Sequence, residues 1–228
     1  MKTALKMKLF FDLLQNRDQF VKEILDGTDL KHKAMQLALL STATFGLYGL
    51  IIGSQHSLRQ ALSSGVKLPI LFLLTNAICL PALFVFSAFF GSKRSPIQAF
   101  VLLLAGTSVM GIALTGFAPV TLFFIITTRN YQFFKIFNVF FFAISGFLGI
   151  VFFARTQSQF FDESSQQKGK ATFLRLWFVL YAFVGTQLAW TLRPFFGAPG
   201  LPFEIVREVG GNFYTDIVRS IGHILGSH

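Results

Sequence analysis

Amide side chains inside long apolar stretches are the residues of this sequence that could carry chemistry within a membrane. Asn76, Asn138 and Gln187 each lie in such a stretch. If the three amides converge on one cavity, they could bind a neutral or anionic solute. If they do not, they form hydrogen bonds between helices, because a polar group in lipid needs a partner. The helix-contact interpretation is favoured, and the solute path is the alternative.

Two cationic side chains lie near the ends of apolar stretches, Lys135 and Arg175. Long cationic side chains at such positions usually extend to the membrane surface and keep their charge in water. The alternative is that one of them faces inward and binds an anion or a lipid headgroup.

Acidic residues are distributed unevenly along the sequence, and their distribution bears on whether the protein could be an ion pump. None of the ten lies between Asp29 and Asp162. Proton and cation transport usually depends on carboxylates within the membrane, so a carboxylate-driven pump is disfavoured. The four histidines are scattered and have no partners at metal-ligand spacing, and Cys79 lies in an apolar stretch. We therefore predict no catalytic residues, no metal site and no cofactor, and we predict that the protein is not an enzyme.

Residues 191–228 form a tail of a different character, rich in proline, glycine and aromatic residues. An amphipathic helix is predicted near its end, from Phe213 to Leu225. The tail either packs back on the membrane helices as a lid or forms a docking surface for another subunit, where aromatic anchors matter most. The candidate docking residues are Arg193, Phe195, Phe196, Phe203, Phe213 and Tyr214.

The elements that must position these residues are membrane helices. Of the 228 residues, 53% are hydrophobic and 13% are charged. This fraction of charged residues is about half that of a soluble domain. Long apolar stretches predict an all-α polytopic bundle over residues 34–190, after a basic amphipathic surface helix and linker at 1–33. Residues 54–67 are polar and predict a loop. The predicted spans are 34–53, 68–90, 98–119, 133–153 and 171–190.

Residues 120–127 are apolar but too short to cross a bilayer alone. They form a kinked continuation of the third span, a half-inserted segment or a sixth crossing. With five spans, the side of the membrane on which the tail lies is opposite to that of the N-terminus.

The formal net charge of +10 comes from 20 Lys and Arg against 10 Asp and Glu. The basic residues gather at the ends of apolar stretches, which predicts contact with anionic headgroups and disfavours nucleic-acid binding. Their excess in the N-terminal segment and in alternate loops predicts a cytoplasmic N-terminus.

Three resemblances accompany these patterns. Residues 20–31, FVKEILDGTDLK, are similar to the actin-binding WASP-homology motif. The whole chain resembles a bacterial family of small multi-span membrane proteins that sometimes carries an automatic actin-binding label for that reason, and this implies the bacterial inner membrane. The five spans are also loosely similar to Yip-type trafficking proteins. The segments that carry the family resemblance are Lys67-Leu68-Pro69, Ile78-Cys79-Leu80-Pro81, Ala118-Pro119-Val120-Thr121 and residues 185–202.

Together these features predict a non-enzymatic membrane subunit or scaffold that assembles with itself or with a partner complex. The alternative function is a channel or carrier for a neutral or anionic small solute. That alternative requires the amides of Asn76, Asn138 and Gln187 to share one cavity.

Overall fold

The computed structural model describes residues 13, 16–89, 95–128, 130–158, 167–197, 202–206 and 213–225, and over these residues it is helical with no strand. Five of the helices are long and apolar enough to cross a bilayer. The chain is therefore an integral membrane protein with a polytopic helical bundle, as the sequence predicts. The helices are α2 (Arg17–Leu25), α3 (Leu30–Ser54), α4 (Leu58–Phe89), α5 (Pro96–Gly116), α6 (Ala118–Thr127), α7 (Tyr131–Ser158), α8 (Gln167–Thr191) and α9 (Phe213–Leu225).

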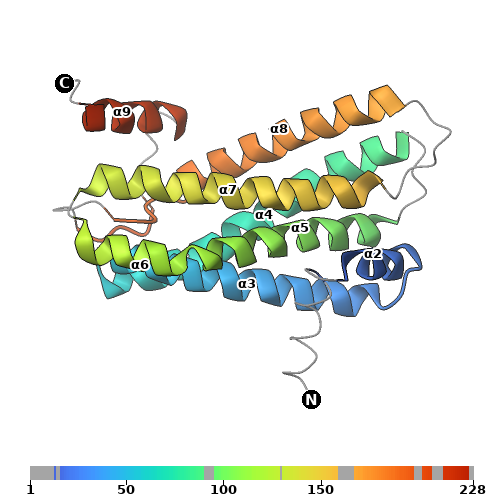
Figure 1. Ribbon diagram of the computed structural model, residues 1–228, viewed down its shortest axis with the longest axis horizontal. Helices are drawn as coiled ribbons and strands as arrows, with labels where there is room; N and C mark the ends of the chain where they lie inside the picture. Colours follow the sequence, from blue (N-terminus) through green and yellow to red (C-terminus); the bar gives the residue numbers. More distant parts are fainter. Residues whose placement is uncertain are drawn as a thin grey trace, which may run out of the picture.

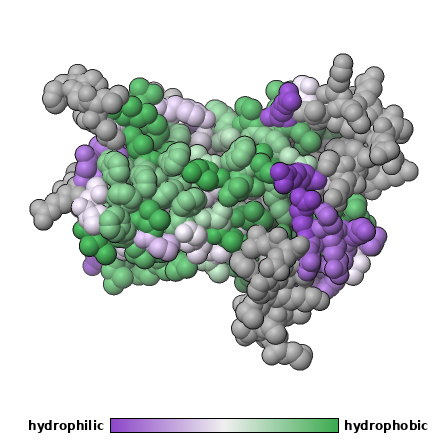
Figure 2. Space-filling model, viewed as in Figure 1, coloured by the Kyte–Doolittle hydropathy of each residue, from purple (hydrophilic) through white to green (hydrophobic). Residues whose placement is uncertain are grey.

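The long helices run lengthwise through the molecule, and the small elements lie at its two ends (Figure 1). At one end, the Gln98 side chain at the start of α5 donates to the Ile24 carbonyl of α2 over 2.9 Å. At the other end, the Gln60 side chain of α4 donates to the Pro194 carbonyl over 2.8 Å. We call these the α2 end and the tail end. Apolar residues cover most of the face between them, and hydrophilic residues gather toward the ends (Figure 2).

The second span begins earlier than the sequence predicts. Residues 58–67, expected to belong to a polar loop, form the first turns of α4. Ser57 explains the early start, because its hydroxyl accepts a hydrogen bond from the Gln60 backbone N–H over 3.2 Å, in the manner of a helix N-cap. Consequently Pro69 lies inside the helix together with Pro81, instead of at its beginning.

The short helix α6 continues α5 along the same neighbour, α7. Gly106 packs on Gly149, and further along the chain Phe117 stacks on Phe141 with 4.4 Å between ring centroids. Phe124 of α6 then meets the ring of Phe137 at 4.4 Å. In these three contacts the residue numbers increase along α5 and α6 while those of their partners decrease along α7. The helices α5 and α6 therefore both run antiparallel to α7. Residues 120–127 are thus a continuation, interrupted at Phe117 just before Pro119.

The described part of the predicted surface helix is α2, which packs on the bundle. Phe20, Val21 and Ile24 are buried, and Phe20 and Ile24 belong to the core together with residues of α3, α4 and α5. Its apolar face therefore contacts protein. Residues 1–12, 14 and 15, which include Lys2, Lys6 and Lys8, lie outside the described residues.

Glycines bring the backbones of α3 and α4 into direct contact. A Cβ atom at Gly53 would lie 2.6 Å from the Gln60 carbonyl oxygen, and one at Gly49 would overlap the Ser64 carbonyl. Gly49 and Gly53 are spaced as a small-xxx-small pair, the pattern that permits close contact between membrane helices. Close approach matters in lipid, where no hydrophobic force draws one helix to another.

We predict that Gly53→Ala lowers the free energy of unfolding by about 1–3 kcal/mol, because the added methyl forces the two backbones apart. Gly116→Ala is the matched control, since a Cβ atom there would meet nothing within 4 Å. Unfolding in detergent micelles, followed by circular dichroism, measures both variants. Equal stability of the two variants would contradict the close-contact explanation.

Candidate functional site

Asn76 joins three helices through a buried hydrogen-bond network. Its amide nitrogen lies 2.9 Å from the Thr107 hydroxyl of α5. Its amide oxygen accepts from the Tyr181 hydroxyl of α8 over 2.7 Å. Asn76 and Thr107 are buried, so this network fixes α4, α5 and α8 to one another.

Asn138 belongs to a second network that holds three other helices. The Tyr48 hydroxyl of α3 donates to the Asn138 amide oxygen over 2.7 Å and lies 3.0 Å from the Thr121 hydroxyl of α6. The Asn138 amide nitrogen donates to the Phe134 carbonyl in its own helix. Tyr48, Thr121 and Asn138 are completely buried.

The structure does not bring the three predicted amides together. Asn76 and Asn138 lie in separate networks, and Gln187 is a half-buried residue of α8 that takes part in neither. None of the three lines the cavity described next. The amides of Asn76 and Asn138 make contacts between helices.

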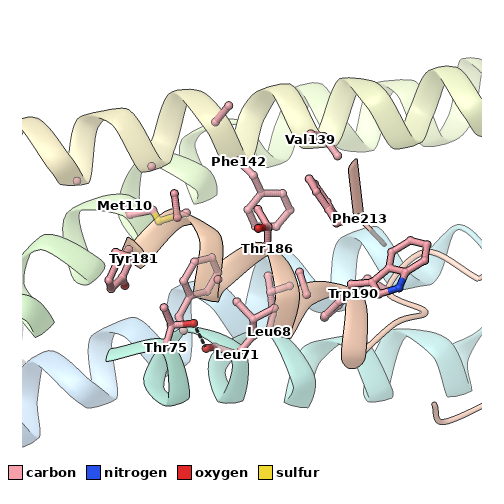
Figure 3. Close-up of a pocket in the computed structure, with 18 of the residues that line it drawn as sticks. Leu68, Leu71, Thr75, Met110, Val139, Phe142, Tyr181, Thr186, Trp190 and Phe213 are labelled. Atoms are coloured by element: carbon pink, nitrogen blue, oxygen red, sulfur yellow. Dashed lines mark hydrogen bonds between the residues drawn. The ribbon is translucent and has the colours of Figure 1, made fainter. Parts of the chain in front are cut away.

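A cavity of about 670 Å³ lies between α4, α5, α7 and α8, with α9 and the tail at one end (Figure 3). In Figure 3, Phe142 projects from α7 into the space, Tyr181 lies toward one end, and Trp190 and Phe213 lie toward the other. Most of the wall is apolar. Its polar groups include the Thr75 hydroxyl, which is bonded within its own helix to the Leu71 carbonyl over 2.7 Å.

The cavity exists because α7 and α8 pack on different helices. α7 packs mainly on α5, and α8 packs mainly on α4. Phe153 of α7 stacks on Trp177 of α8 with 5.4 Å between ring centroids. Away from that contact, small residues of both helices line the space, among them Gly146 and Gly185. A Cβ atom at either glycine would meet its nearest neighbour at ordinary contact distance, 3.7–3.8 Å.

Charged side chains line the tail end of the cavity. The Lys135 ammonium lies 3.0 Å from the Asp216 carboxylate of α9, and the lysine side chain is only 11% exposed. The Arg193 guanidinium lies over the Trp190 ring, 3.5 Å from its centroid. Of the two cations that the sequence singles out, Lys135 faces the cavity, whereas Arg175 is exposed on α8 and does not line it.

The first part of the tail packs back on the bundle. The Ser64 hydroxyl donates to the Phe195 carbonyl over 2.5 Å, and the Phe196 ring meets Phe134 edge to face at 5.8 Å. Gly197 has φ +67°, and a Cβ atom there would lie 2.5 Å from the His56 ring, so glycine is needed for both reasons. This placement corresponds to the lid among the two predicted alternatives.

The other predicted docking residues differ in their exposure. The Tyr214 hydroxyl lies 3.0 Å from the Thr186 hydroxyl of α8, and half of the tyrosine side chain is exposed. Phe213 lines the cavity. Phe203 is half-buried. Residues 198–201 and 207–212 lie outside the described part of the tail.

Sequence patterns did not predict the cavity or two of the residues that line it, Trp190 and Asp216. A signal for Asp216 was present, because it shares a face of the predicted tail helix with Phe213 and Ile217, at helical spacing. An acidic residue on an apolar face needs a cationic partner. Lys135, already noted as a cation that could face inward, was the candidate.

Comparison of the chain with protein-family models, with curated proteins and with solved structures finds no match. The resemblances to the bacterial family, to the WASP-homology motif and to Yip-type proteins stay predictions. What the fold defines is a polytopic helical membrane protein, and the site is an apolar cavity with charged groups at one end.

We predict that Asn76→Ala lowers the free energy of unfolding by about 1–2 kcal/mol, because the Thr107 and Tyr181 hydroxyls lose their shared partner. Gln187→Ala removes an amide of α8 that lies outside both networks, and a change within about 0.5 kcal/mol is expected. Unfolding of both variants in the same detergent tests this. A loss for Gln187→Ala as large as that for Asn76→Ala would contradict the assignment.

Proposed function

We propose that the chain is a non-enzymatic membrane protein that binds the apolar part of an amphipathic molecule, such as a phospholipid acyl chain, in its cavity. The observation that carries this proposal is the combination of aromatic and small apolar walls with charge at one end. A volume of about 670 Å³ lies within the range of about 300–1,000 Å³ typical of small-molecule sites.

The surroundings of the cavity favour a ligand from the bilayer. The cavity is partly open, and exposed apolar side chains flank it, including Phe140 and Phe147 on α7 and Phe183 on α8. Lipid chains are the solvent at this depth of a membrane, so they are the first molecules to reach it. The basic N-terminal segment supports the further proposal of a cytoplasmic N-terminus, and the resemblance to the bacterial family supports the proposal of the bacterial inner membrane.

The channel or carrier alternative is not supported by the geometry. It required Asn76, Asn138 and Gln187 to share one cavity, and they lie apart. Each of the two asparagine amides is already bonded to groups of neighbouring or the same helices.

Tryptophan fluorescence gives a direct test, because the two tryptophans of the chain, Trp177 and Trp190, both line the cavity. Both are also buried, 3% and 8% exposed. We predict that phosphatidylcholine with brominated acyl chains quenches this fluorescence in reconstituted protein. Gly146→Leu, which fills the cavity, is expected to reduce the quenching at least twofold.

Gly116→Leu is the matched control for that experiment. It makes the same chemical change at an exposed glycine outside the cavity, and it should leave the quenching at the wild-type value. Quenching that is equal in wild type and Gly146→Leu would mean that lipid does not enter the cavity.

A second candidate function, assembly of the protein with itself, is favoured by the exposed side of α8. This is the least buried of the five candidate spans, and Leu176, Val179 and Phe183 are exposed on it. We propose that two copies pack through this side, as expected of a membrane subunit or scaffold.

We predict that Val179→Cys forms a disulfide-linked dimer on mild oxidation in native membranes. Val85→Cys on α4 is the matched control, because the two valines are 67% and 61% exposed. The natural Cys79 is buried and contributes no background. Gel electrophoresis without reductant measures the dimer. Equal crosslinking of the two variants would rule out a specific α8 interface.

A further inference from the structure

The ion pair at the tail end of the cavity joins two elements that are far apart in the chain. Lys135 lies in the first turns of α7, and Asp216 lies in the first turn of α9, 81 positions later. The Lys135 ammonium also lies 5.9 Å from the Tyr131 ring centroid. A lysine that is 11% exposed needs an anion nearby, because an unpaired charge is costly to remove from water.

Asp216 is a less buried partner than Lys135. Its side chain is 33% exposed, and α9 packs on the outside of the bundle against α7 and α8. The opposite side of α9 is exposed at Val218 and Ile221. The carboxylate that neutralises Lys135 thus comes from a short peripheral helix, whereas the lysine belongs to a membrane span.

Charge at this end of the cavity favours an anionic ligand. Among the described lining residues the charged ones are Lys135, Arg193 and Asp216, so an ammonium and a guanidinium group both lie at this end of the cavity. A phosphate group accepts hydrogen bonds from both ammonium and guanidinium groups, and it carries the same sign of charge as the carboxylate. The aromatic side chains of Tyr131 and Trp190 beside these cations are typical of headgroup depth.

We propose that the cavity selects an anionic phospholipid of the surrounding bilayer, whose phosphate replaces the Asp216 carboxylate on Lys135 while one acyl chain enters the cavity. This inference rests on the proposed lipid-binding function and adds the headgroup class. Asp216 acts in it as an internal competitor that holds Lys135 when no anionic headgroup is bound.

The test compares two brominated lipids, phosphatidylglycerol and phosphatidylcholine, as quenchers of the cavity tryptophans in the reconstituted full chain. Wild type should be quenched at lower mole fractions of phosphatidylglycerol. Lys135→Gln should lower that preference about tenfold, the effect of losing one hydrogen bond to a charged group. Asp216→Asn should raise it, because the competitor is gone. Arg175→Gln, which removes an exposed cation outside the cavity, should leave it unchanged.

The outcomes separate this inference from the proposed function. If phosphatidylcholine quenches wild type and Gly146→Leu prevents it, but Lys135→Gln and Asp216→Asn keep the wild-type preference, headgroup selection by Lys135 is overturned and lipid binding stands. Absence of any preference in wild type overturns the selection as well. Loss of preference in Lys135→Gln together with a gain in Asp216→Asn supports it, and this opposite pair is not produced by misfolding.

Discussion

The contact on which the rest of the bundle depends is the close approach of α3 and α4 at Gly49 and Gly53. Lipid offers no hydrophobic force between helices, so packing and hydrogen bonds must hold them together. α3 then contacts α5 and α6 as well, and its Tyr48 hydroxyl reaches Asn138 of α7. One helix with small residues on one side and a buried tyrosine on another therefore positions four others.

The positions of α7 and α8 follow from that centre. α7 lies on α5 where Gly106 and Gly149 meet. α8 lies on α4, where Tyr181 bonds to Asn76 and the Trp177 ring nitrogen donates to the Cys79 carbonyl over 3.2 Å. Because each outer helix is fixed to a different inner one, the space between them is not closed by their own packing. The cavity is a consequence of this packing of α7 and α8 on two different helices.

The sequence predicts the helical bundle and its five spans because apolar stretches of this length have few other folds. The prediction is wrong at residues 58–67, where the polar side chains indicate a loop. A cap at Ser57 and backbone contact with α3 stabilise a helix there instead. The amides of Asn76 and Asn138 are predicted as contacts between helices, but their partners are not, because these lie 31 to 105 positions away. The cavity is a property of helix spacing, and no local pattern encodes it.

The early start of α4 has a consequence for the depth of the protein in the bilayer. A helix of 32 residues is about 48 Å long, whereas the hydrocarbon core is about 30 Å thick. The helix is thus longer than the hydrocarbon core is thick, so α4 tilts or its polar first turns extend beyond the hydrocarbon. Gln60 and Ser64, on the added turns, hold the backbone of the tail. These bonds fix the tail, and with it the charged end of the cavity, at one position along α4. Bilayer thickness therefore determines which part of a lipid lies opposite them.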